Sequence, residues 1–397
     1  MPVLAVAAVA LSWGRHPPAV VEVVVVALLA GSVLAAVHHA EVVAHRVGEP
    51  FGSLVLAVAV TIIEVSLIVT LMVAGGPDTA SLARDTVFAA LMITCNGIVG
   101  LSLVIGALRR GMAVYQSEGT TGPLATIATL AALCLVLPSF TTASPGPVFS
   151  PTQLAFAAVA SLVLYGLFVF VQTVRYRDYF LPPPCPPSPP DAGPGGADRE
   201  APNLDLAHGA ARAPGPAARQ HPADTPDSPD TGTAAADTAE HAPPPSAGTA
   251  AASLGLLVAA LVGVVGLAKV ESPSIGEAVA AAGLPGSFVG VVIALLVLLP
   301  ETLAAVRNAA HDRVQVSFNL AFGSAMASIG LTIPAIAVAS IWLDGPVVLG
   351  LGATQIVLLA LTVSVGILTV VPGRAALLRG GVHLVVCAAF LFLAANP

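Results

Sequence analysis

Residues 54–74 read LVLAVAVTIIEVSLIVTLMVA, a run of apolar and hydroxyl-bearing residues with a single carboxylate, Glu64, at its midpoint. At about 1.5 Å per helical residue, this run is long enough to cross a hydrocarbon core of about 30 Å. Glu64 would then lie near the centre of the bilayer, where an ionised side chain costs about 3 kcal/mol. Such a residue predicts a functional site with a partner; a protonated structural Glu inside a helix bundle is the simpler alternative.

A second carboxylate follows a similar run in the other half of the chain. Residues 288–299 are all apolar and lead directly into Pro300 and Glu301. Because Pro300 has no N–H group, a carbonyl one turn earlier loses its helical partner and is free to contact an ion. The two glutamates are therefore candidates for one site.

The composition of the whole chain is that of a membrane protein. Hydrophobic residues make up 56% of it and charged residues 9%, against about 25% charged residues in soluble domains. Apolar runs bounded by charge, Gly or Pro predict an all-α polytopic protein with about eleven transmembrane helices. The expected ranges are 2–14, 18–37, 50–74, 86–107, 122–142, 151–173, 251–269, 284–306, 315–342, 346–371 and 380–396.

Basic residues are distributed unevenly over the loops. The loops after even-numbered helices hold nine Arg residues, and those after odd-numbered helices hold three Arg or Lys residues. Since cytoplasmic loops carry an excess of Lys and Arg, this predicts a cytoplasmic N-terminus and a C-terminus outside. The chain has no dense basic cluster, so we expect no nucleic-acid partner. Its apolar composition predicts that a lipid bilayer surrounds it. A homo-oligomer is left open.

One stretch breaks the membrane pattern. Residues 175–250 are rich in Pro, Ala, Gly and acidic residues, which predicts a disordered acidic cytoplasmic linker. The linker separates an N-terminal helix, 1–17, and a first five-helix repeat, 18–174, from a second five-helix repeat, 251–397.

The two halves align at an offset of 230 residues, which pairs Phe88 with Phe318 and Gly100 with Gly330. Five helices per repeat is an odd number, so the second repeat must enter the membrane from the opposite side. Inverted repeats of this kind are typical of secondary transporters, whose ion sites lie near the membrane midplane where the repeats meet.

Glu64 and Glu301 would face each other at that place. Two carboxylates in a poorly hydrated cavity cannot both stay ionised alone, so they would bind protons or a cation as shared ligands. Ca²⁺ takes roughly six to eight oxygen ligands. Candidate further ligands are Thr61, Thr94, Asn96, Ser102, Asn319, Ser324 and Ser328, each of which could instead bond to backbone.

A cluster with titratable side chains lies at the cytoplasmic end of the second helix. His38, Glu41 and His45 share one helical face. The cluster is either a pH sensor or cation entry point, or an interfacial structural group. The chain lacks H-E-x-x-H, a phosphate-binding loop and the D-K-T-G of phosphorylated pumps, so ATP-driven transport is not expected.

Five motifs agree in order with a known family: HAEVVAHRVGEPFGS at 39–53, IEVSLI at 63–68, PE at 300–301, NLAFGS at 319–324 and LTIP at 331–334. In these the chain resembles the calcium/proton antiporters of the calcium:cation antiporter superfamily, most closely the bacterial Cha type. The resemblance implies an inner-membrane antiporter that exports Ca²⁺, with Na⁺ or K⁺ as further cargo, in exchange for protons. It implies no cofactor, and it places the essential acids at Glu64 and Glu301.

The chain departs from the vacuolar members of that family. They have G-N-x-x-E in both repeats, whereas Val60-Thr61 and Val297-Leu298 stand in the equivalent places here. The loss of both Asn side chains removes two oxygen ligands. It favours an alternative, a Na⁺ or K⁺/H⁺ antiporter with little Ca²⁺ activity. An intramembrane enzyme is a further alternative, but no nucleophile or metal triad lies beside either Glu.

Overall fold

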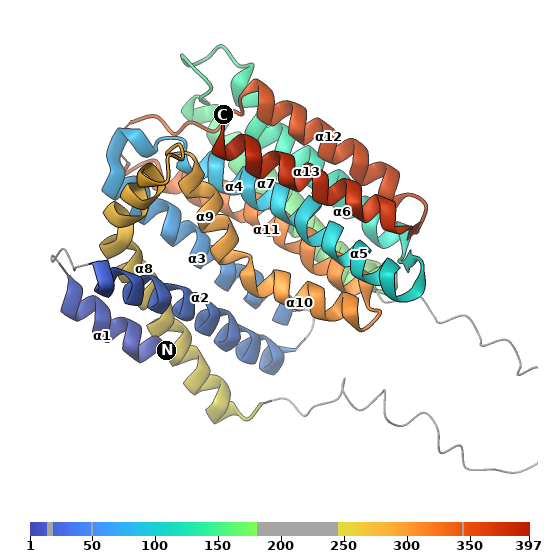
Figure 1. The fold of residues 1–397 in the computed structure, drawn as a ribbon, viewed down its shortest axis with the longest axis horizontal. Helices are drawn as coiled ribbons and strands as arrows, with labels where there is room; N and C mark the ends of the chain where they lie inside the picture. The colour runs from blue at the N-terminus through green and yellow to red at the C-terminus, as the bar shows by residue number, and fades with distance from the viewer. Residues whose placement is uncertain (14–18, 49–50, 181–244, 344) are drawn as a thin grey trace, which may run out of the picture. The chain divides into compact units, whose positions relative to one another are not determined.

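The computed structural model describes residues 1–13, 19–48, 51–180, 245–343 and 345–397. They form helices joined by short connections, with one two-residue β-ladder (Figure 1). The predicted linker lies for the most part in 181–244, outside the described residues, and stays a prediction.

Six helices and their short extensions come before the linker. They are α1 Pro2–Ser12, α2 Ala19–Val47, α3 Phe51–Gly75, η1 Gly76–Thr79, α4 Leu82–Met92, η2 Ile93–Ile98, α5 Val99–Arg110, β1 Ala113–Val114, α6 Ser117–Ala131, η3 Ala132–Val136, η4 Leu137–Ser139, α7 Pro151–Phe170, η5 Val171–Arg175 and η6 Arg177–Phe180. The α4, η2 and α5 segments form one continuous run, so they count as a single long helix with a π-helical turn in the middle.

The second half repeats this arrangement. Its elements are α8 Ala247–Ala281, α9 Phe288–Val297, α10 Leu299–Ala310, α11 Val314–Ala339, α12 Ala353–Val370, β2 Arg374–Ala375 and α13 Leu377–Ala395. The α9 and α10 helices break at Leu298 and are bent by 53°. Pro300, near the start of α10, explains the break because it cannot donate the next helical hydrogen bond.

The eleven predicted helices are all present. Nine described helices are long and apolar enough to cross a membrane, and the bent α9–α10 pair makes a tenth. The remaining helix, α1, has 11 residues and is too short to cross the membrane alone. It packs on α8 and α2. Both α2 and α8 run about ten residues beyond the predicted ends, because a helix continues through polar sequence after its apolar run stops. The prediction of an all-helical polytopic protein is confirmed.

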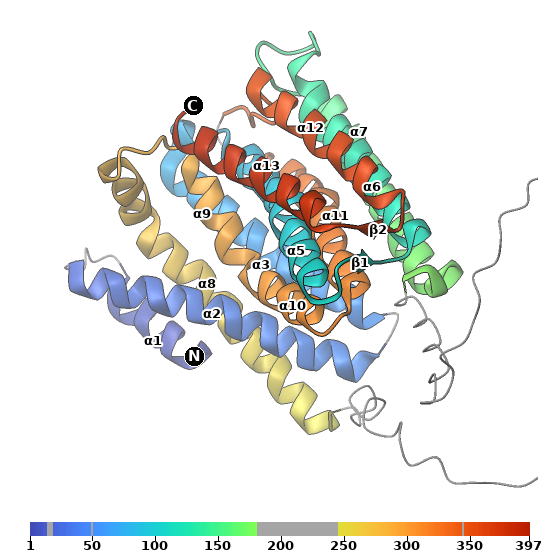
Figure 2. The same ribbon diagram turned by 45° about the vertical axis from the view of Figure 1, so that its right-hand side comes forward.

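The connections gather at two faces of the helix bundle. On one face, β1 and β2 pair as an antiparallel ladder (Figure 2). Arg110 forms an ion pair of 3.0 Å with Asp312 on the same face. We call this the ladder face. On the other, the far face, the Val348 N–H donates to the Ala80 carbonyl and the Gly350 N–H to the Pro147 carbonyl, both at 3.0 Å.

The two repeats run in opposite directions. The end of α5 meets the start of α11 through the Arg110–Asp312 pair on the ladder face. The start of α4 meets the segment beyond α11 on the far face, where Arg84 Nη1 donates to the Gly350 carbonyl at 3.2 Å. The equivalent helices α4–α5 and α11 are therefore antiparallel, and the predicted inverted repeat is confirmed.

The packing partners of equivalent helices are also equivalent in the two repeats. In the first repeat α7 packs on α11, and its equivalent α13 packs on α5. The aligned glycines mark these contacts, because a Cβ on Gly330 would lie 2.8 Å from Tyr165 of α7 and one on Gly100 would lie 3.0 Å from Leu384 of α13. Small residues let membrane helices approach closely, so the aligned glycines have a packing role.

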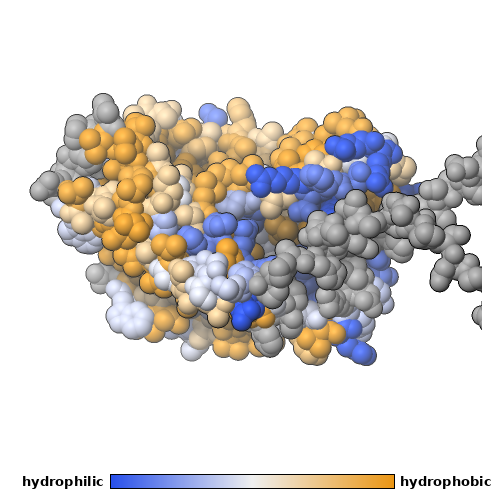
Figure 3. All heavy atoms as spheres, turned by 90° about the horizontal axis from the view of Figure 1, so that it is seen from below, coloured by the Kyte–Doolittle hydropathy of each residue, from blue (hydrophilic) through white to orange (hydrophobic). Residues whose placement is uncertain are grey.

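Apolar side chains cover much of the surface seen in Figure 3. Hydrophilic side chains gather toward the right-hand end of that view, where the α5–α6 and α12–α13 connections lie in Figure 1. This distribution fits a bundle that spans a bilayer with its ladder face in water.

Gly380 tests the packing of α13 on α5. A Cβ at Gly380 would lie 2.9 Å from the Val104 nitrogen and 3.0 Å from the Gly100 carbonyl, whereas one at Gly381 would meet nothing within 4 Å. We expect Gly380→Leu to lower the free energy of unfolding by about 1–3 kcal/mol through overpacking, and Gly381→Leu to change it little. The measurement is the thermal unfolding midpoint in detergent; equal midpoints for the two variants would contradict this packing.

Candidate cation site

Glu64 lies in α3 with its side chain inside the bundle and 4% of the residue exposed. Its Oε1 accepts a hydrogen bond of 2.6 Å from the Ser328 hydroxyl of α11. Ser324 and Ser328 lie four residues apart and so share the face of α11 that meets α3. This bond joins the two repeats at Glu64, the midpoint of the apolar run 54–74.

Glu301 lies in the first turn of α10, directly after the break at Leu298. Its Oε2 is buried and has no hydrogen-bond partner in the part of the chain that the structure describes. A buried carboxylate oxygen without a partner is costly, so the group requires a proton, a cation or water.

Both glutamates line one cavity of about 250 Å³. Four of the candidate further ligands, Thr61, Asn319, Ser324 and Ser328, line it too, and their role as ligands stays a prediction. Sequence reasoning missed the contribution of α7, which supplies Tyr165, Phe168 and Val169, and of its extension η5, which supplies Gln172. Nothing in the sequence alone indicated this helix, because the contact between Gly330 and Tyr165 is visible only in the structure.

The cavity extends toward the ladder face. From Glu64 its lining follows α3 back to Leu56, near the start of that helix, and α11 back to Val316. Gln172 lines it from the end of α7. In the same region of α11, a Cβ on Gly323 would meet open space within 4 Å. The cavity therefore runs from the glutamates toward the ladder face.

Two polar side chains of the lining are already hydrogen-bonded elsewhere. The Thr61 hydroxyl donates to the Ala57 carbonyl at 2.8 Å, and Asn319 Nδ2 donates to the Phe180 carbonyl at 2.7 Å. Asn319 Oδ1 accepts from Gln315 at 3.0 Å. A hydroxyl or carbonyl oxygen keeps a second lone pair, so both groups can still act as weak ligands.

Three predicted ligands do not line this cavity. Thr94 donates to the Ala90 carbonyl at 2.7 Å and Ser102 to the Ile98 carbonyl at 2.8 Å. Asn96 lies in the π-helical turn η2 and faces α12 and α13. There its Nδ2 donates to Thr362 at 2.9 Å, and its Oδ1 lies 3.1 Å from His383 Nδ1. Sequence spacing alone could not show which way the π-helical turn presents Thr94 and Asn96.

His38, Glu41 and His45 lie on an exposed face of α2 and do not line the cavity. The His38 ring makes an edge contact with His39, with 5.5 Å between the ring centroids. Their role as a pH sensor or entry point stays a prediction.

The described residues contain no group of three or more His, Cys, Asp or Glu side chains that could hold a metal ion. The cavity offers two carboxylates, the hydroxyls of Thr61, Ser324 and Ser328, and the side-chain amide of Asn319. Such a set suits transient binding of protons or of a small cation with water completing its shell, which is typical of secondary transporters with inverted repeats.

The chain belongs to the family described as sodium/calcium exchanger protein, whose model matches residues 18–174 and 252–395. It is therefore a transporter, a cation exchanger of the calcium:cation antiporter superfamily, and not an enzyme.

Two relatives are similar along most of their length. A protein of Sinorhizobium fredii (strain NBRC 101917 / NGR234), which carries the provisional name ionic transporter y4hA, is 42% identical over 93% of this chain and 87% of its own. The sodium-potassium/proton antiporter ChaA of Escherichia coli (strain K12) is 29% identical over 98% of this chain and 93% of its own.

Solved structures share the fold at low sequence identity. The structure of native YfkE has a TM-score of 0.66 at 13% identity and covers 100% of this chain and 97% of its own. The H⁺/Ca²⁺ exchanger CAX has a TM-score of 0.58 at 14% identity, covering 99% and 92%.

Ser328→Ala tests the bond between the repeats. Removal of the hydroxyl leaves Glu64 Oε1 without its donor, so we expect a loss of about 1 kcal/mol in the free energy of unfolding. Ser324→Ala, one turn earlier on the same face, removes no bond to Glu64 and is the matched control. Thermal unfolding in detergent checks both; a larger loss for Ser324→Ala would argue against this bond as the link between α3 and α11.

Proposed function

We propose that the protein is a secondary antiporter that exchanges Ca²⁺, with Na⁺ or K⁺ as further cargo, for protons at Glu64 and Glu301. The observation that carries this proposal is the shared cavity. Among the residues that the structure describes, one carboxylate there has a single hydrogen-bond donor and the other has a buried oxygen with no partner. Both groups gain from a proton or from a cation, and they cannot hold both at once.

This mutual exclusion supplies the coupling. When protons occupy the carboxylates the cation site is neutral and empty, and when a cation binds the protons must leave. Transport then requires only that the loaded site open alternately to each face. In the described conformation the site opens to the ladder face.

The choice of cation depends on the oxygen ligands that the cavity supplies. Glu64, Glu301, Ser324 and Ser328 offer carboxylate and hydroxyl oxygens, and Thr61 and Asn319 are partly committed to other bonds. Ca²⁺ would need several waters to complete roughly six to eight ligands. The name of ChaA, a sodium-potassium/proton antiporter, supports the second candidate, a Na⁺ or K⁺/H⁺ antiporter with little Ca²⁺ activity.

The orientation follows from the distribution of basic residues. We place the ladder face in the cytoplasm of a cell with this protein in its inner membrane, because Arg109, Arg110, Arg374 and Arg379 lie in the connections of that face. The linker would then be cytoplasmic and the C-terminus outside. A cytoplasmic N-terminus stays a prediction, because α1 is too short to cross the membrane and Met1 lies beside Gly31 in the middle of α2.

Substitution of either central glutamate tests the shared site. We expect Glu64→Gln and Glu301→Gln each to abolish exchange in proteoliposomes, because an amide can neither release a proton nor neutralise a cation. Glu118→Gln, which changes an exposed carboxylate at the start of α6, is the matched control and should exchange like the unmodified protein. The readout is a pH-sensitive dye inside the vesicles as cation is added; undiminished exchange by either central variant would refute the site.

Competition between protons and cation gives a second test. The half-saturating concentrations of Ca²⁺, Na⁺ and K⁺ are measured in turn at several pH values on the side of addition. We expect each effective cation to need a higher concentration as the pH falls, because protons occupy the same carboxylates. A response at micromolar Ca²⁺ would identify a Ca²⁺/H⁺ antiporter, a response to millimolar Na⁺ or K⁺ alone would identify the second candidate, and a half-saturating concentration independent of pH would contradict the shared site.

A further inference from the structure

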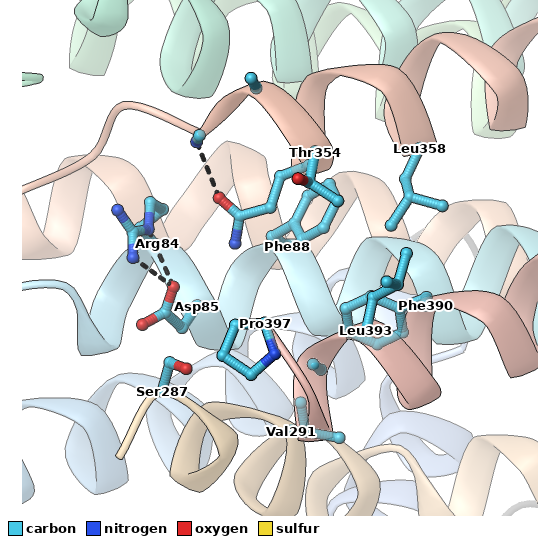
Figure 4. A pocket seen from close by; sticks show the side chains of 14 residues that line it. Arg84, Asp85, Phe88, Ser287, Val291, Thr354, Leu358, Phe390, Leu393 and Pro397 are labelled. Carbon is cyan, nitrogen blue, oxygen red and sulfur yellow. Dashed lines mark hydrogen bonds and ion pairs between the residues drawn. The ribbon is translucent and has the colours of Figure 1, made fainter. Parts of the chain in front are cut away.

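A second cavity, of about 340 Å³, opens on the far face. It lies between the start of α4, the start of α9, the start of α12 and the end of α13 (Figure 4). The residues that carry its chemistry are Arg84, Asp85, Phe88, Ser287, Gln355 and Phe390. Asp85 is the only acidic side chain among the described residues that line it.

The inverted repeat relates this cavity to the glutamate cavity. The glutamate cavity is bounded by the starts of α3 and α11 and by the end of α7. The equivalents of these segments are the starts of α9 and α4 and the end of α13, which bound the second cavity. The two cavities thus occupy equivalent positions in the repeats and open on opposite faces.

A tight helix contact separates the second cavity from the glutamates. A Cβ on Gly290 of α9 would lie 2.8 Å from the backbone of Asp85 and Thr86 of α4. Phe88 and Val291, which also lie along this seam, are almost completely buried. The seam between α4 and α9 is closed, while the equivalent region between α3 and α11 contains the open space at Gly323.

Asp85 is held by a guanidinium group at the edge of this seam. The residue is 5% exposed, and its Oδ1 lies 2.8 Å from both Nε and Nη2 of Arg84 (Figure 4). Its Oδ2 accepts a bond of 2.8 Å from the Ser81 hydroxyl. Arg84 also donates from Nη1 to the Gly350 carbonyl, so it links α4 to the segment before α12.

The residue equivalent to Asp85 in the second repeat is neutral and does not line the glutamate cavity. The offset of 230 residues places Gln315 opposite Asp85. Gln315 bonds to the Gln116 N–H and to Asn319 on the ladder face, and Gln315 and Gln116 carry no charge. The carboxylate at residue 85 is therefore a specific feature of the far side and is not required by the helix packing that the repeats share.

We propose that the second cavity is the far half of the cation pathway and that Asp85 is its cation-binding residue, occupied by the Arg84 guanidinium while the seam is closed. The ligand is the transported hard cation, Ca²⁺, Na⁺ or K⁺. When the seam opens, the cation takes the place of the guanidinium at Asp85 before it leaves on the far face or after it enters from there. This inference rests on the proposed antiport.

Exchange measured separately from each face tests the role of Asp85. The half-saturating cation concentration is determined in vesicles of known orientation for Asp85→Asn and Arg84→Gln. The matched controls are Asp312→Asn and Arg110→Gln, which change the other Arg–Asp pair, 3.0 Å apart on the ladder face. We expect Asp85→Asn to raise the far-face value about tenfold, Arg84→Gln to lower it, and neither to alter the ladder-face value. The control pair should leave the far-face value unchanged.

Three results would overturn the proposal. They are equal shifts on both faces for Asp85→Asn, no shift on either face, or an equal far-face shift for Asp312→Asn. If Asp85→Asn does not fold, Arg84→Gln still tests the proposal. The proposal predicts that Arg84→Gln lowers the half-saturating cation concentration on the far face, whereas Asp85→Asn should raise it. An unmodified protein that exchanges no cation refutes the antiport itself, which separates the two failures.

Labelling of single cysteines tests the pathway without transport. In a chain whose four native cysteines are replaced by Ser, Ser287→Cys should react with a membrane-impermeant maleimide from the far face only. Gln172→Cys, in the glutamate cavity, should react from the ladder face only. Protection of Ser287→Cys by added cation, lost when Asp85→Asn is combined with it, supports binding in the second cavity; labelling of Ser287→Cys from the ladder face overturns its assignment to the far half.

Discussion

The structure depends on the burial of two carboxylates inside an apolar helix bundle. Glu64 is paired with one hydroxyl, from Ser328, and Glu301 keeps a buried oxygen that no described group satisfies. A soluble protein would solvate these oxygens with water, but a bilayer core offers none. The free energy of the bundle therefore depends on what occupies the cavity, and a site that is incomplete when empty is suited to bind and release small ions.

The inverted repeat turns one architecture into two possible access routes. Equivalent seams, α3 with α11 and α9 with α4, lie on opposite sides of the glutamates. The first contains the open space at Gly323, and the second is closed by Gly290 against the backbone of α4. Because both seams are built from equivalent helices, closing one and opening the other requires no new kind of packing.

Much of this could be predicted from the sequence. The apolar runs predicted the helices, and the places of Glu64 and Glu301 in equivalent helices of the two halves predicted one shared site. Both glutamates do line one cavity. The orientation of individual side chains could not be predicted in the same way. Asn96 turns toward His383 because a π-helical turn changes the face on which it projects. Arg84 and Asp85 were expected only as loop residues before a helix, because nothing in the sequence shows that the segment before α12 returns to meet them.

The packing of α2 and α8 has a mechanical consequence. These two long helices pack along each other and on α3, whereas α5, α6, α12 and α13 pack mainly among themselves and on α11 (Figure 2). The α3 helix, which carries Glu64, is thus the main element through which a displacement of the long pair would reach the rest of the bundle. A force applied to α2 or α8, by lateral pressure or by a change in bilayer thickness, would act first on the helix that carries Glu64.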